Sequence, residues 1–279
     1  MAGTAARAAV VAGVDESEAA LAAVRWAAEE ATNRGRRLLL CHAGMFDTAD
    51  LGRHERTKDA PLLLENAHHW LKRAARVAEA TAPGVPIEYL VRLGIAGELL
   101  VELSGEAELL VLGSHGIGGL RGAAIGSVAL RVAASAHCPV VVVRGAVKRD
   151  GPVVAGVDGD DRVLEFAFEA AQSRRVPVVA VHAWHEGLMD EPEVVEAAEQ
   201  TERQALRRRV EGLCGKYPDV IARGRAVRDR SAARALMNFD DAQLVVIGTR
   251  GRGPVAGGLF GSTGNRLLAQ SGCPVGVVH

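Results

Sequence analysis

The sequence predicts an α/β protein built from two similar halves, each an open five-stranded parallel sheet with helices on both faces. Short apolar runs alternate with longer amphipathic stretches along the chain, which is typical of parallel strands joined by crossover helices. A segment that begins at Val111 also recurs at Val246 without a gap. The same supersecondary unit therefore occurs twice.

The repeat also indicates where one half ends and the next begins. The similarity between the halves extends upstream, where AAVVAGVDES, ending at Ser17, resembles GPVVAGVDGD, ending at Asp160. The polar stretch 144–152 follows one β-rich run and precedes the next. We therefore expect two domains, over residues 1–147 and 148–279.

Each half is expected to contain the same order of elements. In the first half the pattern predicts strands near 8–14, 37–43, 87–92, 108–112 and 139–143, and helices near 17–33, 61–81, 96–104 and 127–136. In the second half it predicts strands near 152–157, 176–182, 220–227, 243–247 and 274–278, and helices near 160–173, 191–215, 231–239 and 262–271.

The composition argues against several classes of protein. The 33 basic and 34 acidic side chains nearly cancel, so the chain has no global field for nucleic acid or an anionic membrane. No apolar run approaches the ~18 residues of a membrane span, and the first residues do not resemble a secretory signal. We expect a cytoplasmic protein whose four cysteines, which form no CxxC pair, are reduced thiols rather than metal ligands.

Both copies of the repeat contain the spacing G-x2-G-x9-G-S, which follows an apolar run and ends where a helix is expected. Glycines let a backbone approach an anion closely, and the N–H groups of a helix N-terminus favour negative charge. The pattern therefore indicates a phosphate cradle, although tight turns and close helix packing would also use glycine. It is neither a P-loop nor the G-x-G-x-x-G fingerprint. The serine that ends each motif is expected to serve as an N-cap or as a donor to phosphate.

Together, the aspartate in VAGVDES and VAGVDGD, the two glycine loops and the closing CPVVVV and CPVGVV resemble the universal stress proteins. The resemblance covers nearly the whole chain. It implies the strand order 3-2-1-4-5, a role in stress responses and, for members with this glycine motif, bound ATP. That strand order places the carboxyl ends of strands 1 and 4 at a topological switch point, where open α/β sheets bind ligands.

The resemblance also implies which residues hold ATP, alone or with Mg²⁺. An aspartate contacts the ribose, the first glycine lies beside it, and the residues around the second and third glycines hold the phosphates. For adenine we select apolar residues at the ends of strands 2 and 4. In the first half these residues are Asp15, Gly113, Gly116, Gly126, Ser127 and Val128, with Ala43 and Leu112 for adenine. In the second they are Asp158, Gly248, Gly251, Gly261, Ser262 and Thr263, with Ala183 and Ile247 for adenine.

No catalytic base, nucleophile elbow or metal-ligand set can be placed beside either loop. We therefore expect a regulatory or sensor protein that acts through nucleotide-dependent conformation or through an unidentified regulatory protein partner. It is expected to pair as a homodimer or as an intramolecular pseudo-dimer. The alternatives are a slow ATPase or nucleotidyl-transfer enzyme on the same fold, and a nucleotide-free structural interaction protein.

The halves differ just after their first strands, where Ser17 in one half corresponds to Asp160 in the other. If the carboxylate of Asp160 faces the cleft, its charge opposes the triphosphate. This difference predicts a second site that is weaker or more dependent on Mg²⁺ than the first, unless Asp160 caps the following helix and points away.

Overall fold

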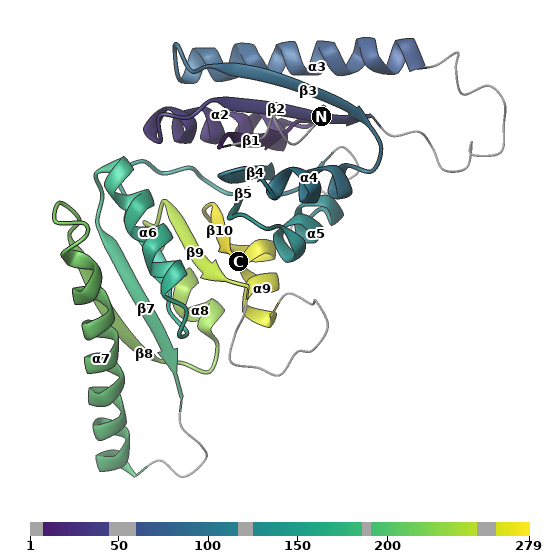
Figure 1. Cartoon of the computed structure of the whole chain (residues 1–279). Helices are drawn as coiled ribbons and strands as arrows, with labels where there is room; N and C mark the ends of the chain where they lie inside the picture. The colour runs from purple at the N-terminus through teal and green to yellow at the C-terminus, as the bar shows by residue number, and fades with distance from the viewer. Residues whose placement is uncertain (1–7, 45–59, 117–124, 186–190, 250–260) are drawn as a thin grey trace. The chain divides into compact units, whose positions relative to one another are not determined.

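The computed structural model describes residues 8–44, 60–116, 125–185, 191–249 and 261–279. The chain divides into two compact units, Met1–Val143 and Arg144–His279. Each unit contains five parallel strands and the helices that connect them (Figure 1). No helix among these residues is long and apolar enough to cross a membrane.

Unit 1 has the strand order β3-β2-β1-β4-β5, and every pairing between neighbours is parallel. Helices α2 and α3 pack together on one face of the sheet, and α4 and α5 pack together on the other. The strands are β1 (Val10–Gly13), β2 (Leu38–Gly44), β3 (Ile87–Leu93), β4 (Leu109–Gly113) and β5 (Val140–Val143). The helices are α2 (Glu18–Asn33), α3 (Ala60–Thr81), α4 (Ala96–Ser104) and α5 (Ser127–Ser135).

Unit 2 repeats this topology in the order β8-β7-β6-β9-β10, with α6 and α7 on one face and α8 and α9 on the other. Its strands are β6 (Val153–Gly156), β7 (Val178–Trp184), β8 (Ala222–Arg228), β9 (Leu244–Gly248) and β10 (Val275–Val278). Its helices are α6 (Asp161–Arg174), α7 (Pro192–Cys214), α8 (Ala232–Met237) and α9 (Ser262–Gln270). The expected α/β fold and strand order are confirmed in both units.

The core of each unit lies between its sheet and the two helix layers. The central strands are apolar at nearly every position and buried, as expected for parallel strands covered on both faces. Cys41, Cys138 and Cys273 are buried free thiols, and Cys214 is half-buried. Burial raises the pKa of Cys41 and of Cys138 to about 12, so both side chains pack as small apolar groups.

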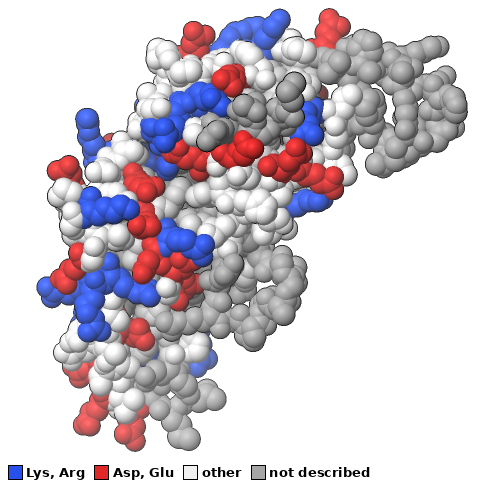
Figure 2. All heavy atoms as spheres, in the orientation of Figure 1, with Lys and Arg blue, Asp and Glu red and all other residues white. Residues whose placement is uncertain are grey.

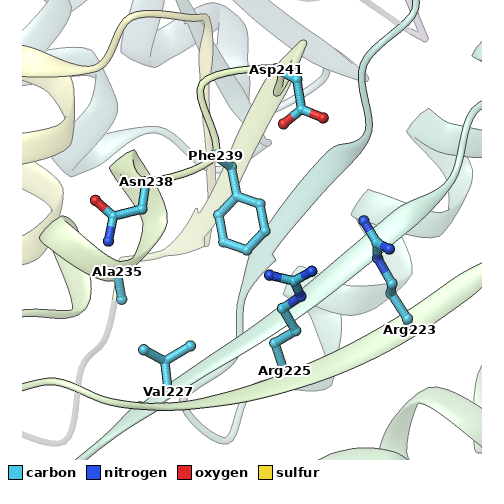
Figure 3. A pocket seen from close by; sticks show the side chains of 7 residues that line it. All are labelled: Arg223, Arg225, Val227, Ala235, Asn238, Phe239 and Asp241. Atoms are coloured by element: carbon cyan, nitrogen blue, oxygen red, sulfur yellow. The ribbon is translucent and has the colours of Figure 1, made fainter.

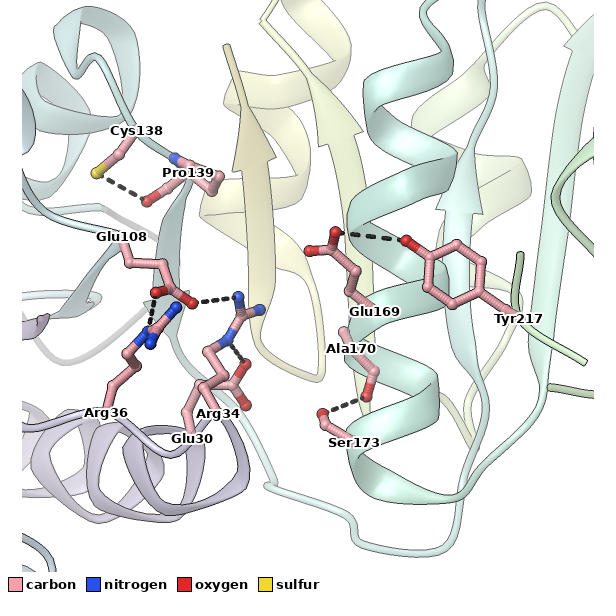
Figure 4. A network of polar contacts seen from close by, with 10 residues as sticks. All are labelled: Glu30, Arg34, Arg36, Glu108, Cys138, Pro139, Glu169, Ala170, Ser173 and Tyr217. Atoms are coloured by element: carbon pink, nitrogen blue, oxygen red, sulfur yellow. Dashed lines mark hydrogen bonds and ion pairs between the residues drawn. The ribbon is translucent and has the colours of Figure 1, made fainter. Parts of the chain in front are cut away.

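A network of four charged side chains closes the end of α2 in unit 1 (Figure 4). The Glu30 side chain is 0% exposed, and its Oε1 lies 2.5 Å from Arg34 Nε. Arg34 also reaches Glu108 at 3.2 Å, and Glu108 pairs in turn with Arg36. Burial opposes the charge of Arg34, but the carboxylates of Glu30 and Glu108 outweigh it and hold its pKa above the usual value. The network therefore anchors the first crossover helix. Elsewhere, Figure 2 shows side chains of both signs interspersed over the face drawn.

Candidate functional site

The carboxyl ends of β1 and β4 bring Asp15 and the glycine loop of unit 1 together. A Cβ atom at Gly116 would lie 2.5 Å from Asp15 Oδ2, so the backbone approaches the carboxylate as closely as glycine allows. The N–H of Gly126 donates to the Ser114 carbonyl at 2.7 Å, which closes the loop on itself. A Cβ at Gly126 would also lie 3.2 Å from His115 Cα. The aspartate and the second and third glycines of the motif therefore converge at one point.

Asp15 also has a local structural role. Its Oδ1 accepts a hydrogen bond from the Ser17 N–H at 2.8 Å, which stabilises the turn between β1 and α2. Ser17 then caps α2, because its Oγ accepts from the Ala20 N–H at 3.1 Å. The same hydroxyl donates to the His115 carbonyl at 3.4 Å and so joins this turn to the glycine loop. Sequence reasoning did not identify this link, because His115 takes part through its backbone.

Gly113 serves close packing. A Cβ at this position would lie 2.6 Å from the carbonyl carbon of Ala19 and 2.9 Å from the amide nitrogen of Ala20. Both are backbone atoms of the first turn of α2, so the end of β4 and this helix touch without a side chain between them. The packing role considered for the motif therefore applies to its first glycine.

The N-cap role expected for Ser127 and Ser262 is wrong. The caps of α5 and α9 are Gly126 and Gly261, and neither helix has a side-chain cap hydrogen bond. The two serines are the first helical residues instead, and both are exposed. A serine at this place can present its hydroxyl outward together with the N–H groups of the first turn.

The next residues of the two helices lie beside these serines. Val128 is 38% exposed, and Thr263 is half-buried. By contrast, Ser17, Asp160 and Ser231 cap α2, α6 and α8 with their side chains. Helices α4 and α7 also begin without a side-chain cap hydrogen bond, so α5 and α9 are distinguished by beginning where the glycine motifs end.

The four residues selected for adenine fall into two classes. Ala43 and Ala183 are half-buried near the carboxyl ends of β2 and β7. Leu112 and Ile247 are each 4% exposed. They fill the space above the glycines at the ends of β1 and β6, so both are core residues that present little surface to a ligand.

Unit 2 shows the same framework where it is described. Asp158 follows β6 and is half-buried, and Gly248 ends β9 and is also half-buried. Gly251 lies outside the described residues. The turn after Asp158 differs from its counterpart, because Gly159 has φ +126°, a conformation that favours glycine.

The prediction that Asp160 weakens the second site loses its physical basis. The Asp160 carboxylate caps α6 by accepting from the Arg162 N–H at 3.1 Å. It also lies 2.5 Å from Arg162 Nη2, and the same guanidinium contacts the His279 carbonyl. The charge of Asp160 is therefore balanced by its own helix, as the capping alternative expects.

His42 and His182 form hydrogen-bonding contacts near the ends of β2 and β7. His42 Nδ1 lies 2.8 Å from the Val14 carbonyl, and His182 Nδ1 lies 2.7 Å from the Val157 carbonyl. In both units the imidazole thus holds the residue just before the aspartate. His182 also lies 3.2 Å from Glu202 of α7 through Nε2. No group of three or more potential metal-ligating side chains occurs among the residues that the structure describes.

Comparisons with known proteins identify the family of this chain. The profile of the universal stress protein family matches residues 7–144 and 151–279. A universal stress protein of Mycobacterium tuberculosis is 33% identical, covering 95% of this chain and 94% of its own. One from Mycolicibacterium smegmatis is 32% identical, covering 97% and 96%. The crystal structure of a universal stress protein from Archaeoglobus fulgidus has a TM-score of 0.71 at 19% identity, covering 97% of each chain, and it shares the fold. This chain belongs to the universal stress protein family and carries two family domains in tandem.

Proposed function

We propose that each unit binds ATP at the carboxyl ends of its two central strands, and that the chain is a regulatory module of a stress response. One observation carries the proposal. Helices α5 and α9 begin at Gly126 and Gly261 without a capping side chain, at the residues where the two glycine motifs end. First-turn N–H groups of this kind favour the charge of a phosphate.

The roles within unit 1 follow from the position of each group. Gly116, Gly126 and the N–H groups of Ser127 and Val128 are proposed to bind the phosphates, with the Ser127 hydroxyl as a further donor. Asp15 Oδ2, which faces Gly116, is proposed to accept a hydrogen bond from the ribose. Gly113 is a packing residue at the edge of this site.

The same roles are proposed for unit 2. Gly251, Gly261, Ser262 and Thr263 bind the phosphates there, and Asp158 contacts the ribose. A Mg²⁺ ion that accompanies ATP would be held largely by phosphate oxygens and water. The output is a change in conformation or in binding to a protein partner, with at most weak hydrolysis of ATP.

The test is calorimetric titration and thermal unfolding of the full chain with ATP. Two sites per chain are expected in the unaltered protein, with a stabilisation of roughly 2.7 kcal/mol at a hundredfold excess over Kd. The Gly126→Val, Gly261→Val double variant should lose this gain, because a branched side chain blocks the approach of phosphate. Gly212→Val, an equivalent change in α7 where no atom lies within 4 Å of the added Cβ, is the control.

Gly261→Val alone keeps the test independent of folding, because an added Cβ there also meets no atom within 4 Å. It should bind one ATP fewer per chain. An ATP-induced shift that persists unchanged in the double variant would overturn the proposal. Phosphate release that disappears in the double variant but not in the control would favour the slow ATPase instead.

A further inference from the structure

We propose that unit 2 carries a second ligand site, separate from the glycine loop, that takes a small aromatic anion: a phosphate or carboxylate group attached to a planar ring. The site is a pocket of about 390 Å³ (Figure 3). This volume lies in the range of small-molecule sites. The residues that matter for recognition are Arg223, Arg225, Val227, Asn238, Phe239 and Asp241.

Arg223, Phe239 and Asp241 lie toward the amino ends of the strands, whereas Val227 pairs with Ala183 near their carboxyl ends. Helix α8 runs back from the carboxyl ends of the strands, so Asn238 and Phe239, which follow it, lie near the amino ends. Asp241 belongs to the same turn, just before β9 begins at Leu244. The nucleotide site proposed above starts at Gly248, where β9 finishes. The pocket therefore takes its lining from β8, from α8 and from the turn before β9, whereas the nucleotide site is proposed at the carboxyl ends of β6 and β9.

The two arginines supply the anion-binding side of the pocket. Arg223 and Arg225 alternate along β8, so their side chains share one face of this edge strand. Gly224 between them faces α7, because its added Cβ would lie 3.0 Å from Leu206. Both arginines are exposed, and neither pairs with a carboxylate of the residues that the structure describes. Two adjacent guanidinium groups that are not ion-paired offer several donors to a phosphate or carboxylate.

Phe239 supplies the surface for a planar ring. Its side chain is half-buried, and the Arg225 guanidinium lies 5.6 Å from the ring centroid. Figure 3 shows both guanidinium groups extending toward Phe239 and Asp241 from the strand below. Val227 and Ala235 add apolar side chains to the lining. A ligand that places a ring beside Phe239 would bring an attached anionic group within reach of the arginines.

The two arginines of the pocket are particular to unit 2. The edge strands β3 and β8 can be aligned through the strand that each one pairs with. Ile87 pairs with Leu38, and Ala222 pairs with Val178, which occupies the same position in unit 2 as Leu38 in unit 1. Arg223 and Arg225 correspond on this basis to Glu88 and Leu90 of unit 1, where the sequence reverses one charge and removes the other. The shared fold therefore does not require these arginines.

Phe239 is likewise absent from the corresponding place in unit 1. Leu236 and Leu100 occupy matching places above the glycines that end β6 and β1. Three residues further on, Phe239 corresponds to Leu103, which is 1% exposed. Unit 1 has an ordinary core leucine there, so the aromatic wall of the pocket is also specific to unit 2.

Removing the charge of Asp241 should have the opposite effect on anion binding from removing the charges of the arginines. Asp241 lines the pocket and forms no ion pair with an arginine among the described residues. It would repel an anion held by Arg223 and Arg225, so removing its charge should strengthen binding. Asn238 adds a neutral hydrogen-bonding group to the same wall.

The experiment is titration of the full chain with phenyl phosphate, followed by calorimetry and by saturation-transfer NMR of the ring protons. Inorganic phosphate and phenol serve as half-ligands. We expect one saturable site, which phenyl phosphate fills more tightly than either half-ligand. The site should persist in the Gly126→Val, Gly261→Val double variant, which separates it from the nucleotide loops.

The variants test each wall in turn. Arg223→Gln with Arg225→Gln should weaken binding about tenfold or more, as expected for the loss of charged hydrogen bonds. Phe239→Leu should weaken phenyl phosphate but leave inorganic phosphate unchanged, and Asp241→Asn should tighten both. Arg208→Gln, which removes the same charge from an exposed site on α7, is the control. Circular dichroism confirms that each variant is folded.

The proposal is overturned if phenyl phosphate does not bind, or if it binds equally to the double arginine variant and to the control. It is also overturned if binding disappears in the double glycine variant, because the ligand would then occupy the nucleotide loops. Arg225→Lys adds a further check. It keeps the charge but loses the planar guanidinium, so it should bind more weakly than the unaltered chain and more tightly than the double variant.

Discussion

Replacing Gly113 by alanine would place a methyl group against the backbone at the start of α2. The new Cβ would lie 2.6 Å from the carbonyl carbon of Ala19, 2.7 Å from its oxygen and 2.9 Å from the Ala20 nitrogen. Backbone atoms in a helix cannot move independently, so the helix or the end of β4 must shift. Overpacking of this kind costs about 1–3 kcal/mol. We therefore expect Gly113→Ala to destabilise unit 1 by this amount.

Gly261→Ala is the contrasting change in the same repeated motif. No heavy atom lies within 4 Å of an added Cβ, and the backbone has φ −59°, which alanine adopts readily. Replacing the N-cap glycine by alanine lowers the free energy of unfolding by about 0.5–1 kcal/mol. The lower conformational entropy of the unfolded chain raises it again by about 0.4–1 kcal/mol. The free energy of unfolding should therefore change little, although the variant lies inside the proposed phosphate site.

Urea denaturation followed by tryptophan fluorescence measures the first change. Trp26 and Trp70 belong to unit 1 and Trp184 to unit 2, so a Trp184→Phe background makes the signal specific for unit 1. Gly113→Ala should lower the urea midpoint in this background. An unchanged urea midpoint would refute the argument that a Cβ at Gly113 is too close to the backbone of α2. A large loss of unit 2 structure in Gly261→Ala, seen by circular dichroism, would refute the statement that an added Cβ at Gly261 meets no atom.

Two further predictions concern buried groups. Arg34→Met should destabilise unit 1 by about 3–5 kcal/mol in urea denaturation, because it leaves the fully buried Glu30 carboxylate without this partner. Arg36→Met, whose side chain is 45% exposed, should cost less than about 1 kcal/mol, and equal losses for the two variants would contradict the buried-pair argument. The Cys41 thiol should resist alkylation in the folded chain until the pH approaches its pKa of about 12, because burial raises that pKa and only the thiolate reacts. Mass spectrometry should show the half-buried Cys214 modified first, and early labelling of Cys41 at neutral pH would count against its burial.

The sequence alone determined the fold class, the repeat and the order of the elements. Strands such as Leu109–Gly113 and Leu244–Gly248 are buried on both faces, so they occur as continuous apolar runs that punctuating loops separate. The glycine spacing and the aspartate after each first strand also located the candidate site, because the chain must use glycine where backbones approach closely. Each of these features involves residues that are close together in the chain, so the sequence alone is enough to recognise it.

Only the tertiary structure decided what individual side chains do there. Gly126, rather than Ser127, is the cap of α5, because the cap depends on where the helix begins to within one residue. The charge of Asp160 is offset by Arg162, which the sequence could not decide without the direction of both side chains. The pocket beside Phe239 combines one face of β8 with the turn after α8, segments that are separate in the chain. Such groups meet only when strand register and helix packing place them side by side, and this is information that residue spacing does not contain.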